Sequence, residues 1–258
     1  MDETSVRKTR ADAPAGFFEA EAAGLAWLGE AETRGGVRVA GVLSVGPGVI
    51  ELERIADARP RPDVAAAFGR ALAMTHDAGA ENFGAPPTGW DGPCFIGRQP
   101  LAVSRASRAW GEFYAADRVL PYLELAVRRG HVTAEEGDVV RSACARIRAG
   151  DFDDGDSPSR LHGDLWNGNV LWSPGGVVLI DPAAHGGHRE TDLAMLALFG
   201  CPYLDEVVEG YATAHPLRDG WRDRIPLHQL HPLAVHAASH GRSYAAPLVD
   251  AARATLAL

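Results

Sequence analysis

The fold of this chain is decided by the stretch LHGDLWNGN at residues 161–169, followed by IDP at residues 180–182. Asp164 and Asn169 stand five positions apart in a turn rich in glycine. Two short apolar runs around SPGG separate the two motifs and predict a β-hairpin. Such a hairpin would return Asp181 to the side of Asp164 and Asn169.

These three side chains suit phosphoryl transfer to a hydroxyl group. One carboxylate must orient the hydroxyl and accept its proton, while an amide and a second carboxylate hold Mg²⁺, which prefers hard oxygen ligands. We assign Asp164 as the catalytic base, and Asn169 with Asp181 as the metal ligands. Each piece alone is an ordinary turn, since Gly, Asp, Asn and Pro are turn formers. The ordered set H-G-D-x-x-x-x-N, then I-D-P, is far more specific.

The composition is that of a folded globular protein. The chain has 258 residues, of which 46% are hydrophobic and 23% charged. Its 25 Lys and Arg against 34 Asp and Glu give a net charge of −9, which disfavours nonspecific binding to nucleic acid or an anionic membrane. The three cysteines form no C-x-x-C pair, and no apolar run approaches about 18 residues. We therefore expect a cytoplasmic protein without a signal peptide, membrane span, disulfide framework or cysteine zinc site.

Lysine is almost absent from the chain. Among the 25 basic residues, Lys8 is the only lysine. A coding bias explains the excess of arginine, but a compact ammonium that is needed as a point charge could not change to a planar guanidinium. Lys8 is therefore a candidate functional residue.

Apolar patterning predicts a small α+β unit followed by a mainly helical part. Residues 4–9 predict a strand, residues 14–31 a helix, and residues 37–44 and 49–55 a strand pair. The long segment 80–101 carries Gly, Pro and aromatic residues and predicts a loop that is functional or docked. Helices are expected at residues 63–79, 104–129, 133–149, 189–199, 203–214, 221–240 and 243–257.

The catalytic motifs resemble the aminoglycoside and choline phosphotransferase branch of the protein-kinase-like fold, and within it the fructosamine kinase (ketosamine-3-kinase) family. The resemblance covers nearly the whole chain from about residue 5, and the Trp of HGDLW is a specific mark of the family. It is carried by LHGDLWNGNVLW at 161–172, IDPAAHGGHRETDLAM at 180–195, FFEAEAAGL at 17–25 and GWRDRIPLHQLHPL at 220–233.

This resemblance implies a two-lobed α+β fold. Residues 1–55 would form a shortened N-terminal nucleotide-binding lobe, and residues 56–258 a mainly helical catalytic and acceptor-binding lobe. A hinge is expected near residues 53–60. The cofactors would be ATP and Mg²⁺.

The resemblance also implies the nucleotide-binding residues. VRK places Lys8 where the family's strand lysine contacts the ATP phosphates, and EAAGL places Glu21 where a helix glutamate holds that lysine. The backbone of Glu53-Arg54-Ile55 would meet the adenine. For Glu53 and Arg54 a solvated strand edge is the simpler interpretation of the side chains.

On the acceptor side, the resemblance places His188 and Arg189 beside the pocket. Trp166 next to the base is either a platform for a sugar face or a packed core residue. Thr191 or Asp192 is expected to cap the helix at 189–199.

Four histidines in one predicted helix raise a metal hypothesis. His228 and His231, and likewise His236 and His240, have spacings that place imidazoles on one helix face. No cysteine is near them. Packed or acceptor-lining histidines are the preferred interpretation over zinc.

The chain departs from the family pattern at its start. The family has two further strands joined by a Gly-rich turn ahead of the lysine strand, whereas only seven residues precede Lys8. About three strands with an exposed sheet edge are therefore expected in the small lobe. Either the start codon lies upstream, or this is a shortened kinase with weakened ATP binding.

The leading functional hypothesis is ATP-dependent phosphorylation of a fructosamine or ribulosamine at its 3-hydroxyl, as a deglycation step. The ketoamine would be a small molecule or protein-bound. The alternatives are a kinase of another small hydroxylated metabolite and a catalytically impaired nucleotide-binding module. The oligomeric state stays open.

Overall fold

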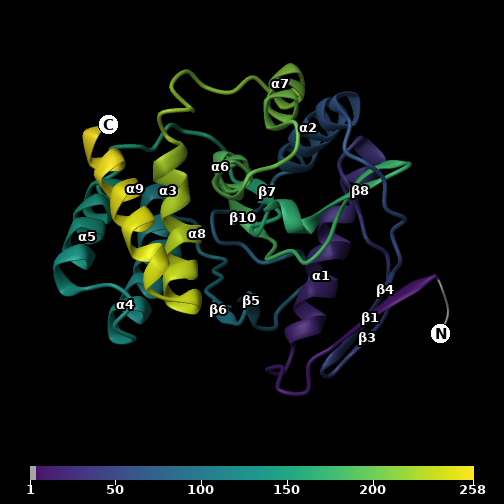
Figure 1. Ribbon diagram of the computed structural model, residues 1–258, viewed down its shortest axis with the longest axis horizontal. Coiled ribbons are helices and arrows are strands. Elements are labelled where there is room, and N and C mark those ends of the chain that lie inside the picture. Colours follow the sequence, from purple (N-terminus) through teal and green to yellow (C-terminus); the bar gives the residue numbers. More distant parts are fainter. Residues whose placement is uncertain (1–3) are drawn as a thin grey trace.

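The N-terminal part of the chain is a small sheet covered by one helix. The computed structural model describes residues 4–258, and Figure 1 shows the sheet at the end where the chain starts. Its antiparallel strands run in the order β1-β4-β3. The bounds are Ser5–Thr9 for β1, Val42–Gly46 for β3, Val49–Glu53 for β4 and Phe17–Gly29 for α1. The predicted strand at 4–9, helix at 14–31 and three-stranded sheet are confirmed within the described residues.

Strand register sets the direction of Lys8. Lys8 of β1 pairs with Ile50 of β4, and Ile50 is fully buried with Phe18 and Leu25 of α1. Side chains alternate along a strand, so the neighbouring Arg7 points to the opposite, exposed face. Lys8 therefore points from the sheet toward α1.

The predicted strand at 37–44 is divided in the structure. Its first part, β2 (Arg38–Val39), leaves the N-terminal sheet and pairs in parallel with β9 (Gly176–Leu179). Its second part is β3, and the Gly41 amide between the two donates to Glu53 Oε1 at 2.9 Å. The expectation of one strand was therefore wrong. Strand β2 ties the N-terminal part to the rest of the chain.

Short strands carry the catalytic motifs in the middle of the molecule. The hairpin predicted around SPGG is confirmed as β8 and β9, and β7 pairs antiparallel with β10. The bounds are Ser159–Leu161 for β7, Val170–Ser173 for β8 and His185–Gly187 for β10.

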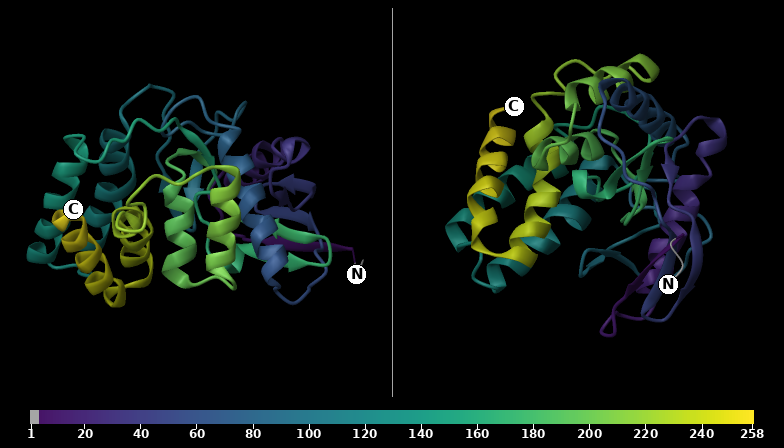
Figure 2. Two further views of the ribbon diagram at one scale, coloured as in Figure 1. Left: turned by 90° about the horizontal axis from the view of Figure 1, so that it is seen from above. Right: turned by 45° about the vertical axis from the view of Figure 1, so that its right-hand side comes forward.

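The rest of the chain is mainly helical, as predicted. Figures 1 and 2 show α4, α5, α8 and α9 gathered at the end opposite the N-terminal sheet, where Leu123, Ile147 and Leu248 are fully buried. The expected helix at 104–129 begins only at Trp110 and contains a π-helical segment, η2. The bounds are Pro62–Asp77 (α2), Trp110–Phe113 (α3), Tyr114–Val119 (η2), Leu120–Arg128 (α4), Ala134–Arg148 (α5), Glu190–Phe199 (α6), Leu204–Ala214 (α7), Ile225–His240 (α8) and Ala245–Ala257 (α9), with short 3-10 turns at Glu32–Arg34 (η1), Asn167–Asn169 (η3) and Arg242–Tyr244 (η4).

The segment 80–101, which was expected to be a loop that is functional or docked, is docked against the rest of the protein. It is not structureless. It contains a hairpin of β5 (Cys94–Ile96) and β6 (Gln99–Leu101). Its first half is fastened to β10, because Gly84 donates to the Gly186 carbonyl and Gly186 donates to the Ala85 carbonyl, both at 2.8 Å.

Across residues 4–258, no helix combines the length and the apolar composition that crossing a membrane would require.

Candidate active site

The catalytic loop begins where β7 ends. Gly163 has a φ of +80°, and a Cβ at this position would lie 2.2 Å from the Ala183 carbonyl oxygen. Only glycine fits both demands, since an L side chain would be strained and would clash with backbone. This close approach brings the residue after it, Asp164, next to the segment that carries Asp181.

The three predicted catalytic side chains meet at one end of a cleft. Asn169 Nδ2 donates to the Asp164 carbonyl at 2.8 Å and lies 3.4 Å from Asp164 Oδ2. Asp164, Asn169 and Asp181 all line the cleft. Asp181 has a φ of +54°, a conformation that is uncommon for a residue with a side chain and is often found at functional sites.

The charge balance around these residues favours a cation. Burial raises the pKa of Asp164 to about 7, and the negative charge of Asp181 adds to the rise. Because Asn169 uses Nδ2 for its contacts with Asp164, its Oδ1 is left as an acceptor. Two carboxylates and a carboxamide oxygen are the donor set that a hard divalent cation prefers.

Lys8 reaches the same place from the small sheet. Its Nζ lies 2.6 Å from Glu21 Oε1 on α1 and also binds Asp181 Oδ1. Burial alone would lower the pKa of Lys8, but the charges and hydrogen bonds of Glu21 and Asp181 outweigh burial and raise it. The structure thus brings together Lys8, Glu21 and Asp181, which lie far apart in the sequence.

Replacing Lys8 by arginine should lower kcat by at least about tenfold, or about 1.4 kcal/mol of barrier. The planar guanidinium is too large for the position of an ammonium between two carboxylates. The measurement is ADP release at saturating ATP. Arg7→Lys is the matched control, because Arg7 is on the exposed face of the same strand. If Lys8→Arg had the kinetics of the wild type, the presence of a single lysine would reflect coding bias and not a functional need for an ammonium group.

His162 and Asp192 hold the catalytic loop in place by hydrogen bonds to its backbone. Asp192 accepts the amides of His162 at 2.8 Å and Gly163 at 3.0 Å. The His162 ring accepts the Asp164 amide at Nδ1 and, through Nε2, donates to the Ile180 carbonyl at 2.9 Å. One imidazole therefore connects the backbone at both catalytic aspartates.

The sequence-based interpretation missed these positioning roles. Asp192 does not cap the helix that contains it, and α6 has no side-chain cap, so that expectation was wrong. The motif alone gives His162 no role. The position of His162 directly before Gly163 and Asp164 is the sequence feature that could have indicated its positioning role.

Arg189 and His188 lie away from the cleft, contrary to the position expected for acceptor residues. Arg189 is buried, pairs with Asp77 at 2.9 Å and Asp156 at 2.8 Å, and donates to the Tyr211 hydroxyl. His188 binds Asp154 at 3.3 Å. Neither residue lines the cleft. Both instead tie the start of α6 to the segment before β7, and Arg189 also ties it to the end of α2, because burial demands partners for their polar groups.

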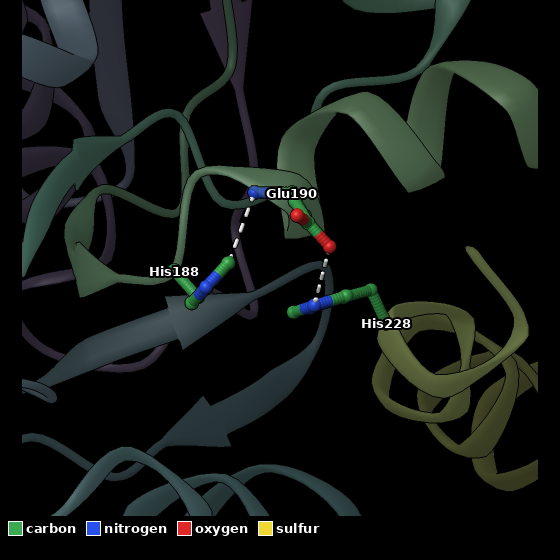
Figure 3. A group of neighbouring side chains, drawn as sticks. All are labelled: His188, Glu190 and His228. Atoms are coloured by element: carbon green, nitrogen blue, oxygen red, sulfur yellow. Dashed lines mark hydrogen bonds and ion pairs between the residues drawn. The ribbon is translucent and has the colours of Figure 1, made fainter. Parts of the chain in front are cut away.

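His188 also belongs to a buried cluster with Glu190 and His228, which Figure 3 shows. Their ligand atoms lie within 4.8 Å of one another, close enough to hold a metal ion. However, Arg224 holds both carboxylate oxygens of Glu190, at 2.6 and 2.9 Å, and already neutralises its charge. His228 lies 3.3 Å from Glu190 Oε2 and 3.0 Å from the Thr191 hydroxyl. These partners support a packing network.

The other histidines of α8 are packed in a similar way. His231 and His236 bind the carbonyls of Arg118 and Pro232 through Nδ1, at 2.8 and 2.7 Å. His240 packs its ring against that of His236, with centroids 5.2 Å apart. None of the four lines the main cleft.

Trp166 forms part of the cleft wall. The residue is 42% exposed, which excludes core packing, and its ring meets that of Phe199 edge-on with ring centroids 6.5 Å apart. A Cβ at Gly168 would lie 2.2 Å from the indole, so glycine leaves the space that the ring occupies. An exposed indole beside Asp164 can support the face of a sugar.

The cleft has a volume of about 500 Å³ and extends away from the Glu53 end of the sheet. Ser5 pairs with Glu53 and Thr9 pairs with Val49, and the cleft includes Lys8 and Thr9 but not Ser5. The cleft therefore lies beside the Lys8–Thr9 end of β1, on the side of Asp164 and Trp166.

The predicted adenine segment lies outside this cleft. The Glu53 carboxylate binds Arg38 at 2.6 Å and the Gly41 amide. The amides of Glu53 and Arg54 donate to the carbonyls of Gly41 and Thr4. Ile55 lies two residues beyond the end of β4.

A small sheet with an ion-paired lysine, set over a loop with a carboxylate and a carboxamide and beside a second carboxylate, defines an ATP-dependent phosphotransferase of the kinase-like fold. Choline kinase from Streptococcus pneumoniae shares this fold, with a TM-score of 0.67 at 15% identity over 100% of this chain and 88% of that one. A family model described as fructosamine kinase matches residues 4–257. The chain belongs to the fructosamine kinase family.

Two similar proteins illustrate the sequence and structural similarity within this family. A probable ketoamine kinase of Enterococcus faecium is 32% identical over 231 residues, which span 89% of this chain and 79% of the relative. The crystal structure of a protein from Thermobifida fusca, provisionally designated fructosamine-3-kinase, has a TM-score of 0.90 at 47% identity. That match covers 98% of this chain and 86% of the other.

Proposed function

We propose that this protein transfers the γ-phosphate of ATP to the 3-hydroxyl of a ketoamine, a fructosamine or ribulosamine, as a deglycation step. The observation that carries the proposal is the convergence of Asp164, Asn169 and Asp181 below the Lys8–Glu21 pair, at one end of a cleft that Trp166 lines. Family membership supports a ketoamine as the acceptor.

Mg²⁺ and ATP fit the residues present. Asn169 Oδ1 and the Asp181 carboxylate would hold the metal, which supplies charge neutralisation for the phosphates. Lys8, kept in place by Glu21, would contact the phosphates. The backbone of Glu53-Arg54-Ile55 would meet the adenine, and the amide of Ile55 is the suited donor because those of Glu53 and Arg54 are already bonded.

The chain's own groups then perform the transfer. Trp166 supports the sugar, and Asp164 orients the attacking hydroxyl and accepts its proton. The raised pKa of Asp164 makes it a better proton acceptor near neutral pH than an ordinary carboxylate. A phosphate at C3 lies next to the C2 carbonyl, so loss of a proton from C1 gives an enaminol that expels inorganic phosphate from C3 and leaves an imine at C1. Water then hydrolyses this imine, which frees the amine and leaves a 3-deoxy dicarbonyl sugar.

The proposal is tested by ADP release with ribulosyl-lysine and fructosyl-lysine, and by NMR assignment of the phosphorylated carbon. The matched control substrate is the corresponding 3-deoxy ketoamine. We expect turnover of the hydroxylated ketoamines, phosphate at C3, and no turnover of the 3-deoxy compound. Phosphate at another carbon would contradict the 3-hydroxyl assignment. Turnover only of other small hydroxylated metabolites would overturn the ketoamine assignment, and no turnover at all would support an impaired nucleotide-binding module.

A further inference from the structure

The cleft has one guanidinium on its rim that the protein leaves unengaged. Arg98 lines the cleft and is exposed. Within residues 4–258 its side chain has no ion pair and donates no hydrogen bond. The exposed Asp12 carboxyl, whose pKa is lowered by Arg10 and more weakly by Arg98, forms its ion pair with Arg10. A free arginine facing a cavity is suited to a planar anion such as a carboxylate.

The position of Arg98 is defined by the hairpin that carries it. Ile96 pairs with Gln99, so Gly97 and Arg98 form a two-residue turn, and Gly97 has the positive φ of +54° that such turns need. The Phe95 ring lies 5.3 Å from that of Phe17 at the start of α1. The hairpin thus packs against the start of α1 and places Arg98 in the same cleft as Asp164.

The other cations of the cleft are already committed. Lys8 binds Glu21 and Asp181. Arg10 lies over the Phe17 ring, 4.7 Å from its centroid, and pairs with Asp12 at 3.2 Å. Arg98 is therefore, as far as the described residues show, the cation of the cleft that neither pairs with a carboxylate nor is assigned to the ATP phosphates.

The distribution of charge in the cleft matches one kind of ketoamine. A ketoamine joins its sugar to a secondary amine, which is cationic at neutral pH. Glu21 and Asp181 already pair with Lys8, but Asp164 has no ion pair within the described residues, and its carboxylate suits a positive charge near the reacting sugar. A negative group carried farther out, on the amine side, would meet Arg98.

Resting on the proposed function, we infer that the cleft selects ketoamines whose amine part carries a carboxylate, as in the ketoamine of a free amino acid, and that Arg98 binds this carboxylate. Arg98 is thus a specificity-determining residue for the acceptor. An exposed pair of this kind is weakened by salt.

The test compares the ribulosyl ketoamines of glycine and glycinamide, which have nearly the same shape and differ in the carboxylate charge. The β-alanine and β-alaninamide pair adds one methylene group between the amine and the carboxylate, and so changes how far the carboxylate extends toward Arg98. We expect wild-type kcat/KM to favour the carboxylate member by about tenfold. The preference should disappear in Arg98→Gln, be partly retained in Arg98→Lys, and shrink in 0.5 M salt. Arg128→Gln is the matched control, because Arg128 is exposed on α4, away from the cleft.

The outcomes separate this proposal from the one on which it rests. Equal turnover of the acid and amide members by the wild type would overturn the role of Arg98 and leave the ketoamine kinase intact. A raised KM for ATP in Arg98→Gln, with unchanged acceptor preference, would overturn it in favour of phosphate binding. No turnover of any ketoamine would contradict the proposed function itself.

Discussion

The Asp164→Asn variant should lose kcat by a factor of about 10² to 10⁴, because a positioned general base contributes that much to proton transfer. Asparagine keeps the size of the side chain and its neighbour Asn169, but it cannot accept the proton of the acceptor hydroxyl. Nucleotide binding should change little, since Lys8, Glu21, Asn169 and Asp181 remain. The measurements are ADP release at saturating substrates and the dissociation constant of Mg·ATP.

Stability provides a second readout for the same variant. Burial raises the pKa of Asp164 to about 7, so the folded protein binds this proton more strongly than the unfolded chain, and stability is lost as pH rises from about 4 to about 7. Asp164→Asn removes that loss. Its melting temperature without nucleotide should therefore equal or exceed that of the wild type at pH 8, and the difference should shrink toward pH 4.

The control is Asp219→Asn, since Asp219 is exposed in the loop before α8. Substantial turnover by Asp164→Asn would remove Asp164 from the role of base. A variant that is inactive and also melts well below the wild type would point to a structural role instead.

The sequence predicted the catalytic set because its members depend on short-range chemistry. Asp164 and Asn169 share one turn, and the β8–β9 hairpin that returns Asp181 has its own turn signal. Lys8 could be predicted from its rarity and from the family resemblance, which also indicated its partner Glu21. The contacts of these residues agree with those expectations.

What could not be predicted depends on packing between distant segments. The splitting of the strand at 37–44 requires β9 as a partner, which no local pattern reveals. The positions of His188 and Arg189 are decided by Asp154, Asp77 and Asp156, which lie far away in the sequence. Polar residues next to a catalytic motif therefore suggested the acceptor pocket, whereas in the structure they are buried and pair with these distant aspartates at the start of α6.

Asp192→Ala should destabilise the protein by about 3–5 kcal/mol, the range for removing one partner of a buried charged network. The substitution leaves three donors without an acceptor, namely the amides of His162 and Gly163 and the Nε2 of His76, which lies 3.2 Å from Asp192. Asp192→Asn should cost less, about 1–3 kcal/mol, because its amide oxygen can still accept. The measurement is the free energy of unfolding in urea at pH 7.

The pH dependence tests whether the negative charge of Asp192 causes the difference in stability between the wild type and Asp192→Asn. Burial would raise the pKa of Asp192, but His76 and the loop amides outweigh burial and hold the pKa below its ordinary value. Stability from such a group is present above the unfolded pKa, near 4, and is lost as pH falls through the lower folded pKa. The gap between wild type and Asp192→Asn should therefore be constant from about pH 8 to pH 5 and shrink below about pH 4.

Activity should fall together with stability, because Asp192 acts on the reaction only through the backbone of the loop. Asp250→Asn, on the exposed surface of α9, is the control. If Asp192→Asn lost kcat but kept the stability and acid response of the wild type, the residue would have a direct part in the transfer that its buried position beneath His162 does not offer. If Asp192→Asn lost neither kcat nor stability, the loop would be held by the His162 ring alone. That ring connects Asp164 and Ile180 without help from α6.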